Sequence, residues 1–288
     1  PLRRQRQMCI RDSAWSDCAG QVAASTTNRV VVLTDSSWGL GKKSRGKHTP
    51  ETETRERLGK KGFVLDTLQI QAGATAEEFA SWLTSFLVMR ARQGGRRVEH
   101  GVELCAENLN TIPPYKGTLV VYWKHNELAV TGSKKKPISA TCINQEIWDS
   151  TTRLAMVMKK FDRAIIIGPG DHRLWNLTKV FDDKGAVLME MMHERGIPTV
   201  DAVSWYADMT KRDQMHFDSN INNKIKLSQL TKNAVQMMWN LDVWKCLSRL
   251  PEVGASAGSN SSHDPSTPIG QQVMQLYQGV PGGQSPRA

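Results

Sequence analysis

The chain lacks cysteine pairs at short spacing. Its five cysteines are odd in number and far apart, and none forms a CxxC or Cys/His pair with zinc-like spacing. This pattern predicts neither a disulfide framework nor a metal site. The chain also has no apolar run near the roughly 18 residues of a membrane span, and no signal peptide opens it. We expect an intracellular, cytoplasmic protein by default, with its true start left open because the chain begins at Pro1.

Aromatic residues are few and charge is unbalanced. The 288 residues are 7% aromatic and 39% hydrophobic, which suffices for one sizeable core. The formal net charge is +10, but the basic residues are scattered, apart from the region 42–61 and the run 134–136. This distribution favours a solvated basic surface over a dedicated site for nucleic acid or anionic lipid. A monomer is the simplest expectation.

Short β-branched or aromatic runs alternate with helical patterns along the chain. The predicted strands are 30–34, 62–70, 118–123, 163–167 and 197–203, and the predicted helices are 75–93, 143–158, 180–195 and 221–248. Such alternation is typical of an α/β fold in which helices cover both faces of a parallel sheet. We predict one domain over residues 29–250. Residues 1–28 are expected to be unstructured, and the Gly/Ser/Pro-rich residues 251–288 are expected to form a disordered tail.

The segment Gly41–His48 nearly matches a phosphate-binding loop. His48 occupies the position whose hydroxyl would hold Mg²⁺, and Pro50 is expected to interrupt the helix that should begin there. A mobile basic loop is therefore the better interpretation, and a nucleotide-binding protein is a distant alternative.

Polar residues and a glycine follow several of the predicted strands. Ser36 follows the first, Gly73 precedes a helix that Thr75 caps after the second, and Asn126 follows the third. Asp213 and His216 come from a late loop. The carboxyl ends of parallel strands meet at one edge of a doubly wound sheet, so these residues are expected to converge. A serine, an imidazole with an orienting carboxylate, and aligned N–H donors suit acyl transfer.

The order of these residues resembles the SGNH hydrolase superfamily, also called GDSL esterases and lipases. The resemblance spans roughly residues 30–245. Its four blocks are Thr34-Asp35-Ser36-Ser37, the Gly73 turn, Lys124-His125-Asn126-Glu127 and Asp213-Gln214-Met215-His216.

The resemblance implies a three-layer α/β/α sandwich with a flavodoxin-like five-stranded parallel sheet. It also implies hydrolysis of a carboxylic ester, such as an acyl or acetyl ester of a lipid or carbohydrate, without metal or organic cofactor. Ser36 would be the nucleophile, His216 the base and Asp213 its orienting carboxylate. The Ser36 and Gly73 N–H groups and the Asn126 amide would form the oxyanion hole.

Several positions depart from the family pattern. Thr34 and Ser37 are mild changes, Glu127 replaces an aspartate, and Lys124 puts a long cation where the family has glycine. These changes keep open an alternative: a catalytically impaired module of this fold that acts as a basic binding protein for RNA or anionic lipid. His172 is a rival for the base, and His125 is expected at the rim of the site.

Overall fold

The computed structural model describes residues 2–25, 27–38, 49–94, 109–130, 139–140, 142–168, 178–206, 209–210 and 216–249. These residues belong to one compact unit that ends at Arg249. Several sequence predictions lie outside the described residues. They concern the Gly41–His48 loop, the run 134–136, His172, Asp213 and the tail 251–288.

Five parallel strands form the central sheet. They are β1 (Arg29–Asp35), β2 (Val64–Gln71), β3 (Tyr115–Tyr122), β6 (Phe161–Ile167) and β7 (Thr199–Val200), and their order is β2-β1-β3-β6-β7. Counted along the chain this is the order 2-1-3-4-5, which is that of flavodoxin-like folds. The predicted α/β class and sheet type are therefore confirmed. Strands β4 (Ala129–Val130) and β5 (Ser139–Ala140) form a separate antiparallel pair.

The apolar run of β1 reflects its central place in the sheet. It is hydrogen-bonded to β2 on one side and β3 on the other, and Val30 to Asp35 are all buried. Val30 and Val32 enter one hydrophobic core, whereas Val31 and Leu33 enter the other. Strands buried on both faces need apolar side chains at successive positions, so no polar alternation is seen.

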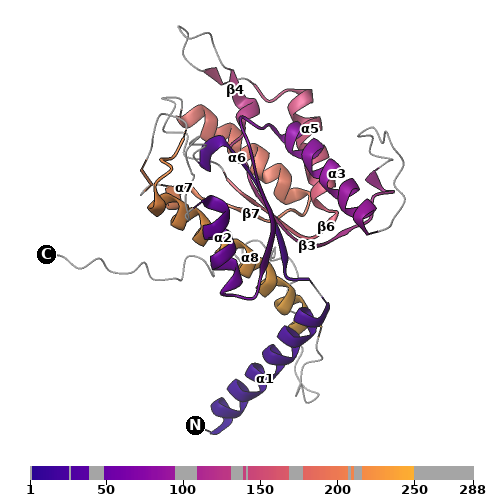
Figure 1. Cartoon of the computed structure of the whole chain (residues 1–288). Helices are drawn as coiled ribbons and strands as arrows, with labels where there is room; N and C mark the ends of the chain where they lie inside the picture. The colour runs from indigo at the N-terminus through magenta and orange to yellow at the C-terminus, as the bar shows by residue number, and fades with distance from the viewer. Residues whose placement is uncertain are drawn as a thin grey trace, which may run out of the picture. The chain divides into compact units, whose positions relative to one another are not determined.

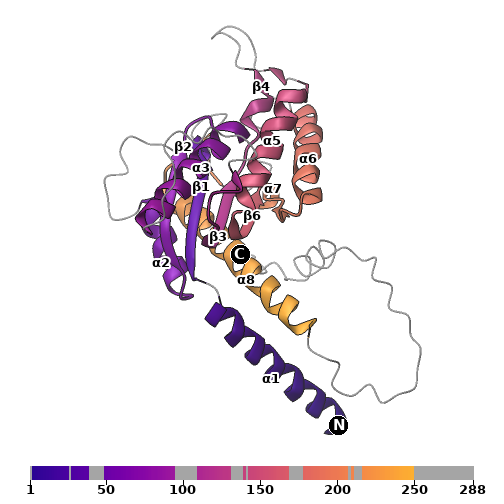
Figure 2. The same ribbon diagram turned by 90° about the vertical axis from the view of Figure 1, so that its right-hand side faces the viewer.

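Helices cover both faces of the sheet and make three layers (Figures 1 and 2). One face packs against α3 (Ala76–Gln93), α5 (Gln145–Met158) and α6 (Thr178–Glu194). The other face packs against α2 (Pro50–Gly59), α7 (Val203–Tyr206) and α8 (Ile221–Leu247). The capping box predicted at Thr75 is present at the start of α3, with Glu78 as its partner.

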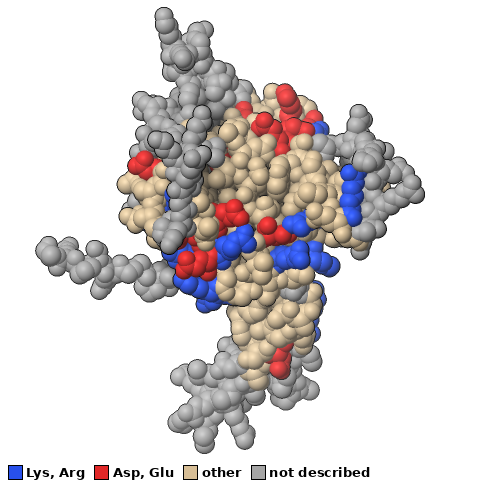
Figure 3. Space-filling view, viewed as in Figure 1, with Lys and Arg blue, Asp and Glu red and all other residues tan. Residues whose placement is uncertain are grey.

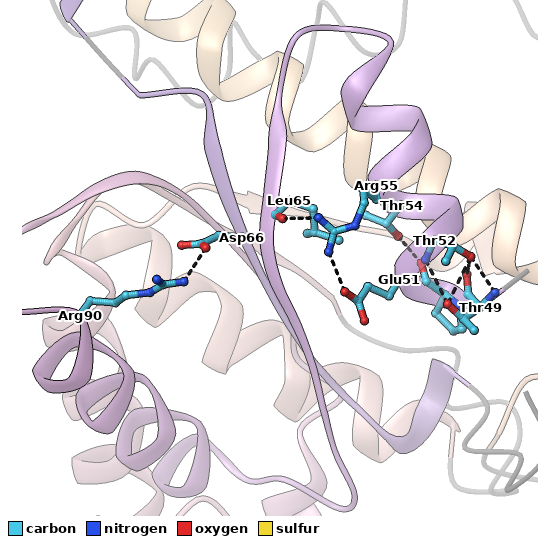
Figure 4. A network of polar contacts seen from close by, with 9 residues as sticks. Thr49, Glu51, Thr52, Thr54, Arg55, Leu65, Asp66 and Arg90 are labelled. Carbon is cyan, nitrogen blue, oxygen red and sulfur yellow. Dashed lines mark hydrogen bonds and ion pairs between the residues drawn. The ribbon is translucent and has the colours of Figure 1, made fainter. Parts of the chain in front are cut away.

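Helix α2 corrects the prediction made for Pro50. That residue does not interrupt a helix but begins one, directly after the capping residue Thr49. A proline is tolerated at the first helical position because its missing N–H would have no partner within the helix. Arg55 then joins α2 to the edge strand β2, donating to the Leu65 carbonyl at 3.0 Å and to Glu51 at 2.7 Å (Figure 4). Arg90 makes the equivalent link from α3 to Asp66.

The prediction of an unstructured N-terminal segment is wrong for Leu2–Ser25, which form α1. This helix packs against the last turns of α8, where Cys18, Val22 and Val243 form a small buried cluster. The rings of Trp15 and Trp244 meet edge to face beside it, with centroids 5.3 Å apart.

The prediction of no disulfide is also wrong, because Cys18 and Cys246 are bonded. They lie 228 residues apart in the sequence, and only the pairing of α1 with α8 brings them together. Disulfides are typical of oxidising compartments, so cysteine spacing no longer supports the expected reducing compartment. Among the described residues, no helix is long and apolar enough to cross a membrane.

We expect the disulfide to hold α1 without supporting the sheet. Replacing Cys18 by serine removes the link to α8, and α1 should lose about 2–4 kcal/mol of local stability. Amide hydrogen exchange should therefore accelerate across α1 while the central strands keep their protection, because the buried residues of the α1 cluster belong to neither sheet core. Cys142→Ser, at the exposed free cysteine, is the control. Equal protection of α1 in both variants would contradict this expectation.

Candidate active site

The strand register brings four strand ends to the same level. Asp35 pairs with Gln71 at the ends of β1 and β2, and Thr34 pairs with Tyr122 near the end of β3. Tyr122 in turn pairs with Ile167 at the end of β6. The residues that immediately follow these strands therefore share one carboxyl edge, where open α/β sheets bind their ligands.

Ser36 leaves β1 in a short 3-10 helix, η1 (Ser36–Trp38). The buried Trp38 anchors this turn, and its ring packs edge to face on Tyr122 with centroids 4.9 Å apart. The Tyr122 hydroxyl lies 2.7 Å from the Thr231 hydroxyl of α8. The turn that carries Ser36 is thus held against both the sheet and α8.

His216 lies beside Ser36, although 180 residues separate them in the sequence. Its Nε2 is 3.1 Å from the Ser36 Oγ, which is hydrogen-bond distance. The next residue, Phe217, is buried and packs on Tyr206 with ring centroids 5.1 Å apart. A hydroxyl and an imidazole at this distance have the geometry of a nucleophile and its general base.

Asn126 joins three strand ends. Its side-chain Nδ2 donates to the Ala74 carbonyl at 2.8 Å and to the Asp35 carboxylate at 3.2 Å. Ala74 follows Gly73, whose φ of 66° lies in the left-handed region that glycine adopts without strain. The segments that contain Ser36, Gly73 and Asn126 are therefore brought together, as the sequence predicts.

His125 is not at the rim, where it was expected. It is fully buried, and its ring contacts the Trp123 ring edge to face at 4.3 Å between centroids. Its φ of 56° is unusual for a residue other than glycine. This conformation turns the chain directly after β3, and η2 (Asn126–Leu128) follows at once. We infer that the buried ring and the turn together set the direction of Asn126.

Lys124 is directed toward the loop that carries His216. Only 6% of the residue is exposed, and its Nζ lies 5.8 Å from the centroid of the Phe217 ring. An ammonium near an aromatic face is attracted by the negative ring face. The Lys124 ammonium thus packs beside Phe217, the residue that follows His216.

Glu127 is a half-buried residue whose importance the sequence alone did not reveal. It accepts hydrogen bonds from the Trp123 Nε1 at 3.0 Å and from the Ala76 N–H at 3.3 Å. Burial is the largest cause that raises the pKa of Glu127 to about 7, and the nearby Asp35 adds to it, whereas the hydrogen bonds lower it. This side chain ties the end of β3 to the first turn of α3, close to Asn126. The one sign of this role in the sequence is that Glu127 follows Trp123, its hydrogen-bond donor, by four residues.

Other features of the described chain lie away from this edge. A cavity of about 340 Å³ lies at the opposite end of the sheet, lined in part by Arg29, Arg90 and Tyr115. Among the described residues, no cluster of His, Cys, Asp or Glu is placed to hold a metal ion. Figure 3 shows basic and acidic side chains close together on one face, over α2 and β2.

The described residues therefore define a doubly wound α/β protein with a serine and a histidine in contact at its carboxyl edge. Comparisons with protein-family models and with curated protein sequences find no match. Solved structures do show similarity. A lipolytic protein of the G-D-S-L family from Veillonella parvula is 8% identical, with a TM-score of 0.45 over 70% of this chain and 96% of that one.

Two further structures are similar at the same level. Est24, a carbohydrate acetylesterase from Sinorhizobium meliloti, is 9% identical, with a TM-score of 0.42 over 72% of this chain and 98% of that one. An aryl esterase of M. smegmatis is 11% identical, with a TM-score of 0.44 over 73% of this chain and 99% of that one. The sheet order and the site geometry, rather than these similarities, support a function for this site.

The raised pKa of Glu127 predicts a pH-dependent contribution to stability. Its pKa of about 7 in the folded protein is above the ordinary 4.5, so the folded state binds the extra proton between these values. The contribution of Glu127 to the free energy of unfolding should be fully present below pH 4.5 and should be lost as the pH rises through 7, by at most about 3 kcal/mol.

Glu127→Gln should flatten this slope, because glutamine still accepts from Trp123 and Ala76 but carries no charge. Urea unfolding between pH 4.5 and 8 measures the slope of the free energy of unfolding against pH. Glu190→Gln, at an exposed position of α6, is the control and should keep the parent slope. The same slope in Glu127→Gln as in the parent protein would refute Glu127 as the cause of this pH dependence.

Proposed function

We propose that this protein hydrolyses carboxylic esters with Ser36 as the nucleophile and His216 as the general base. The observation that carries the proposal is the 3.1 Å contact between the His216 Nε2 and the Ser36 Oγ at the carboxyl edge of the sheet. A hydroxyl is a poor nucleophile until a base removes its proton, and an imidazole within hydrogen-bond reach can do so near neutral pH.

The proposed reaction has two steps. The Ser36 Oγ attacks the ester carbonyl while its proton moves to His216, and the resulting imidazolium returns that proton to the departing alcohol. Water then attacks the acyl group on Ser36 with His216 again as base, which releases the acid and restores both residues. We assign Asp213, three residues before His216, as the carboxylate that orients the imidazole and stabilises its charged form.

The oxyanion of each step needs donors that already point at it. We assign this role to the N–H groups of Ser36 and Gly73 and to the Asn126 side-chain amide. The hydrogen bond from Asn126 to the Ala74 carbonyl supports this assignment, because it keeps the amide beside the Gly73 turn. The second bond of the amide, to Asp35, is the longer one and is the one that an oxyanion would replace.

Loss of either reacting group should abolish turnover. Ser36→Ala and His216→Ala should each lower kcat for short-chain p-nitrophenyl esters by at least about 10³-fold while leaving the fold intact. His193→Ala, at an exposed histidine of α6, is the control and should keep full activity. Hydrolysis at the parent rate by a folded Ser36→Ala protein would sink the assignment of the nucleophile.

Removing the amide of Asn126 should act mainly on kcat. Asn126→Ala is expected to lower kcat by about 10²- to 10³-fold with a small change in KM, because an oxyanion donor acts in the transition state. Asn144→Ala is the matched control, since it removes a capping hydrogen bond of 3.0 Å at the start of α5. The control should lose stability but keep its kcat. A rise in KM alone in Asn126→Ala would instead assign the amide to substrate binding.

One observation favours a second candidate, a binding module of this fold without catalysis. The Asn126 amide already donates to two acceptors, the Ala74 carbonyl and the buried Asp35 carboxylate. With a net charge of +10, such a module would suit an anionic partner. Binding of RNA that weakens steeply with salt, combined with no ester turnover, would support this candidate.

A further inference from the structure

Asn223 connects both ends of the loop that carries His216. This side chain is 3% exposed and lies in the first turn of α8. Its Oδ1 accepts from the Thr210 N–H at 3.2 Å. Its Nδ2 donates to the Thr210 carbonyl at 2.6 Å and to the Asp218 carbonyl at 3.0 Å. One buried amide therefore satisfies backbone groups at the two ends of residues 210–218, here called the His216 loop.

The two ends of the His216 loop are also bonded to each other. The Asp218 N–H donates to the Thr210 carbonyl at 3.0 Å. Asn220, the capping residue of α8, accepts from the Asn223 N–H at 2.9 Å and donates to the Thr210 hydroxyl. The base of the loop is thus linked to the first turn of a helix whose next turns are buried against the sheet.

The segment between these ends contains the whole D-x-x-H motif. Asp213 and His216 lie between Thr210 and Asp218 in the sequence. The contact from the His216 Nε2 to the Ser36 Oγ, at 3.1 Å, requires close placement of the imidazole. Phe217 supplies an apolar anchor inside the loop, and Asn223 supplies the polar one at its base.

We propose that Asn223 is a positioning residue that holds His216 at its catalytic distance from Ser36. The proposal rests on the proposed function. Among the described residues Asn223 has no hydrogen bond to Ser36 or His216, so we expect it to act through its bond to the Asp218 carbonyl, two residues after His216. It should act on the chemical step and not on the binding of the ester.

The test compares two asparagines that are adjacent in the same helical turn. Asn223→Ala removes the buried amide, whereas Asn222→Ala changes an exposed residue. With p-nitrophenyl acetate, Asn223→Ala should lower kcat by about 10- to 100-fold and leave KM within about twofold. Asn222→Ala should match the parent protein.

Asn223→Asp covers the case in which the alanine variant does not fold. It keeps the acceptor for the Thr210 N–H but loses both donations, so kcat should again fall. Thr210→Val removes only the hydroxyl contacts and leaves the backbone bonds, so its kcat should stay within about threefold of the parent. Parent kcat in a folded Asn223→Ala or Asn223→Asp protein would overturn the proposal.

Amide hydrogen exchange tests the role of Asn223 in the loop without relying on ester hydrolysis. The Asp218 amide should exchange faster in Asn223→Ala than in Asn222→Ala, because its bond to Thr210 loses support. Equal exchange in both variants would overturn the role of Asn223. Faster exchange in Asn223→Ala together with no ester turnover in the parent protein would refute the proposed function and leave the loop-holding role standing.

Discussion

The burial of β1 on all sides is the constraint on which the rest of the structure depends. This strand is hydrogen-bonded to β2 and β3, and its side chains enter hydrophobic cores on both faces. A strand in this position can leave the sheet only at its ends. Asp35 at the end of the strand is still buried, and Ser36, the next residue, is the first partly exposed polar residue at the carboxyl edge. Because β2 and β3 end at about the same height as β1, the turns that follow them lie beside Ser36.

Polar groups at this edge are buried or half-buried. The Asn126 amide, the Glu127 carboxyl and the His125 ring all lie within a few residues of the end of β3. Hydrogen bonds and charges interact more strongly where water is excluded, and an unsatisfied group costs more there. The same low polarity that raises the pKa of Glu127 would strengthen the donors of an oxyanion hole.

The third block, residues 124–127, contains two residues that differ from the sequence pattern it resembles, and the structure places them differently. Glu127 keeps a carboxyl near the first turn of α3, where it accepts from the Ala76 N–H and from the Trp123 Nε1. Lys124 places its ammonium near Phe217 and so packs against the His216 loop. The basic character of the chain is thus partly internal, and on the face over α2 and β2 it is mixed with acidic groups (Figure 3).

The sequence by itself determined the five strands, most of the helices and the α/β class, because these follow from local periodicity and capping. The start of α3 at Thr75 is the clearest case, since a capping box needs only two residues three positions apart. The sequence also marked Ser36, Gly73, Asn126 and His216 as candidates. Tertiary structure decided what depends on contacts between distant segments. The Cys18–Cys246 bond, the burial of His125 and the contacts of Asn223 with both ends of the His216 loop are of this kind. None of these has a local pattern, because the energy of each comes from a partner whose position only the folded chain defines.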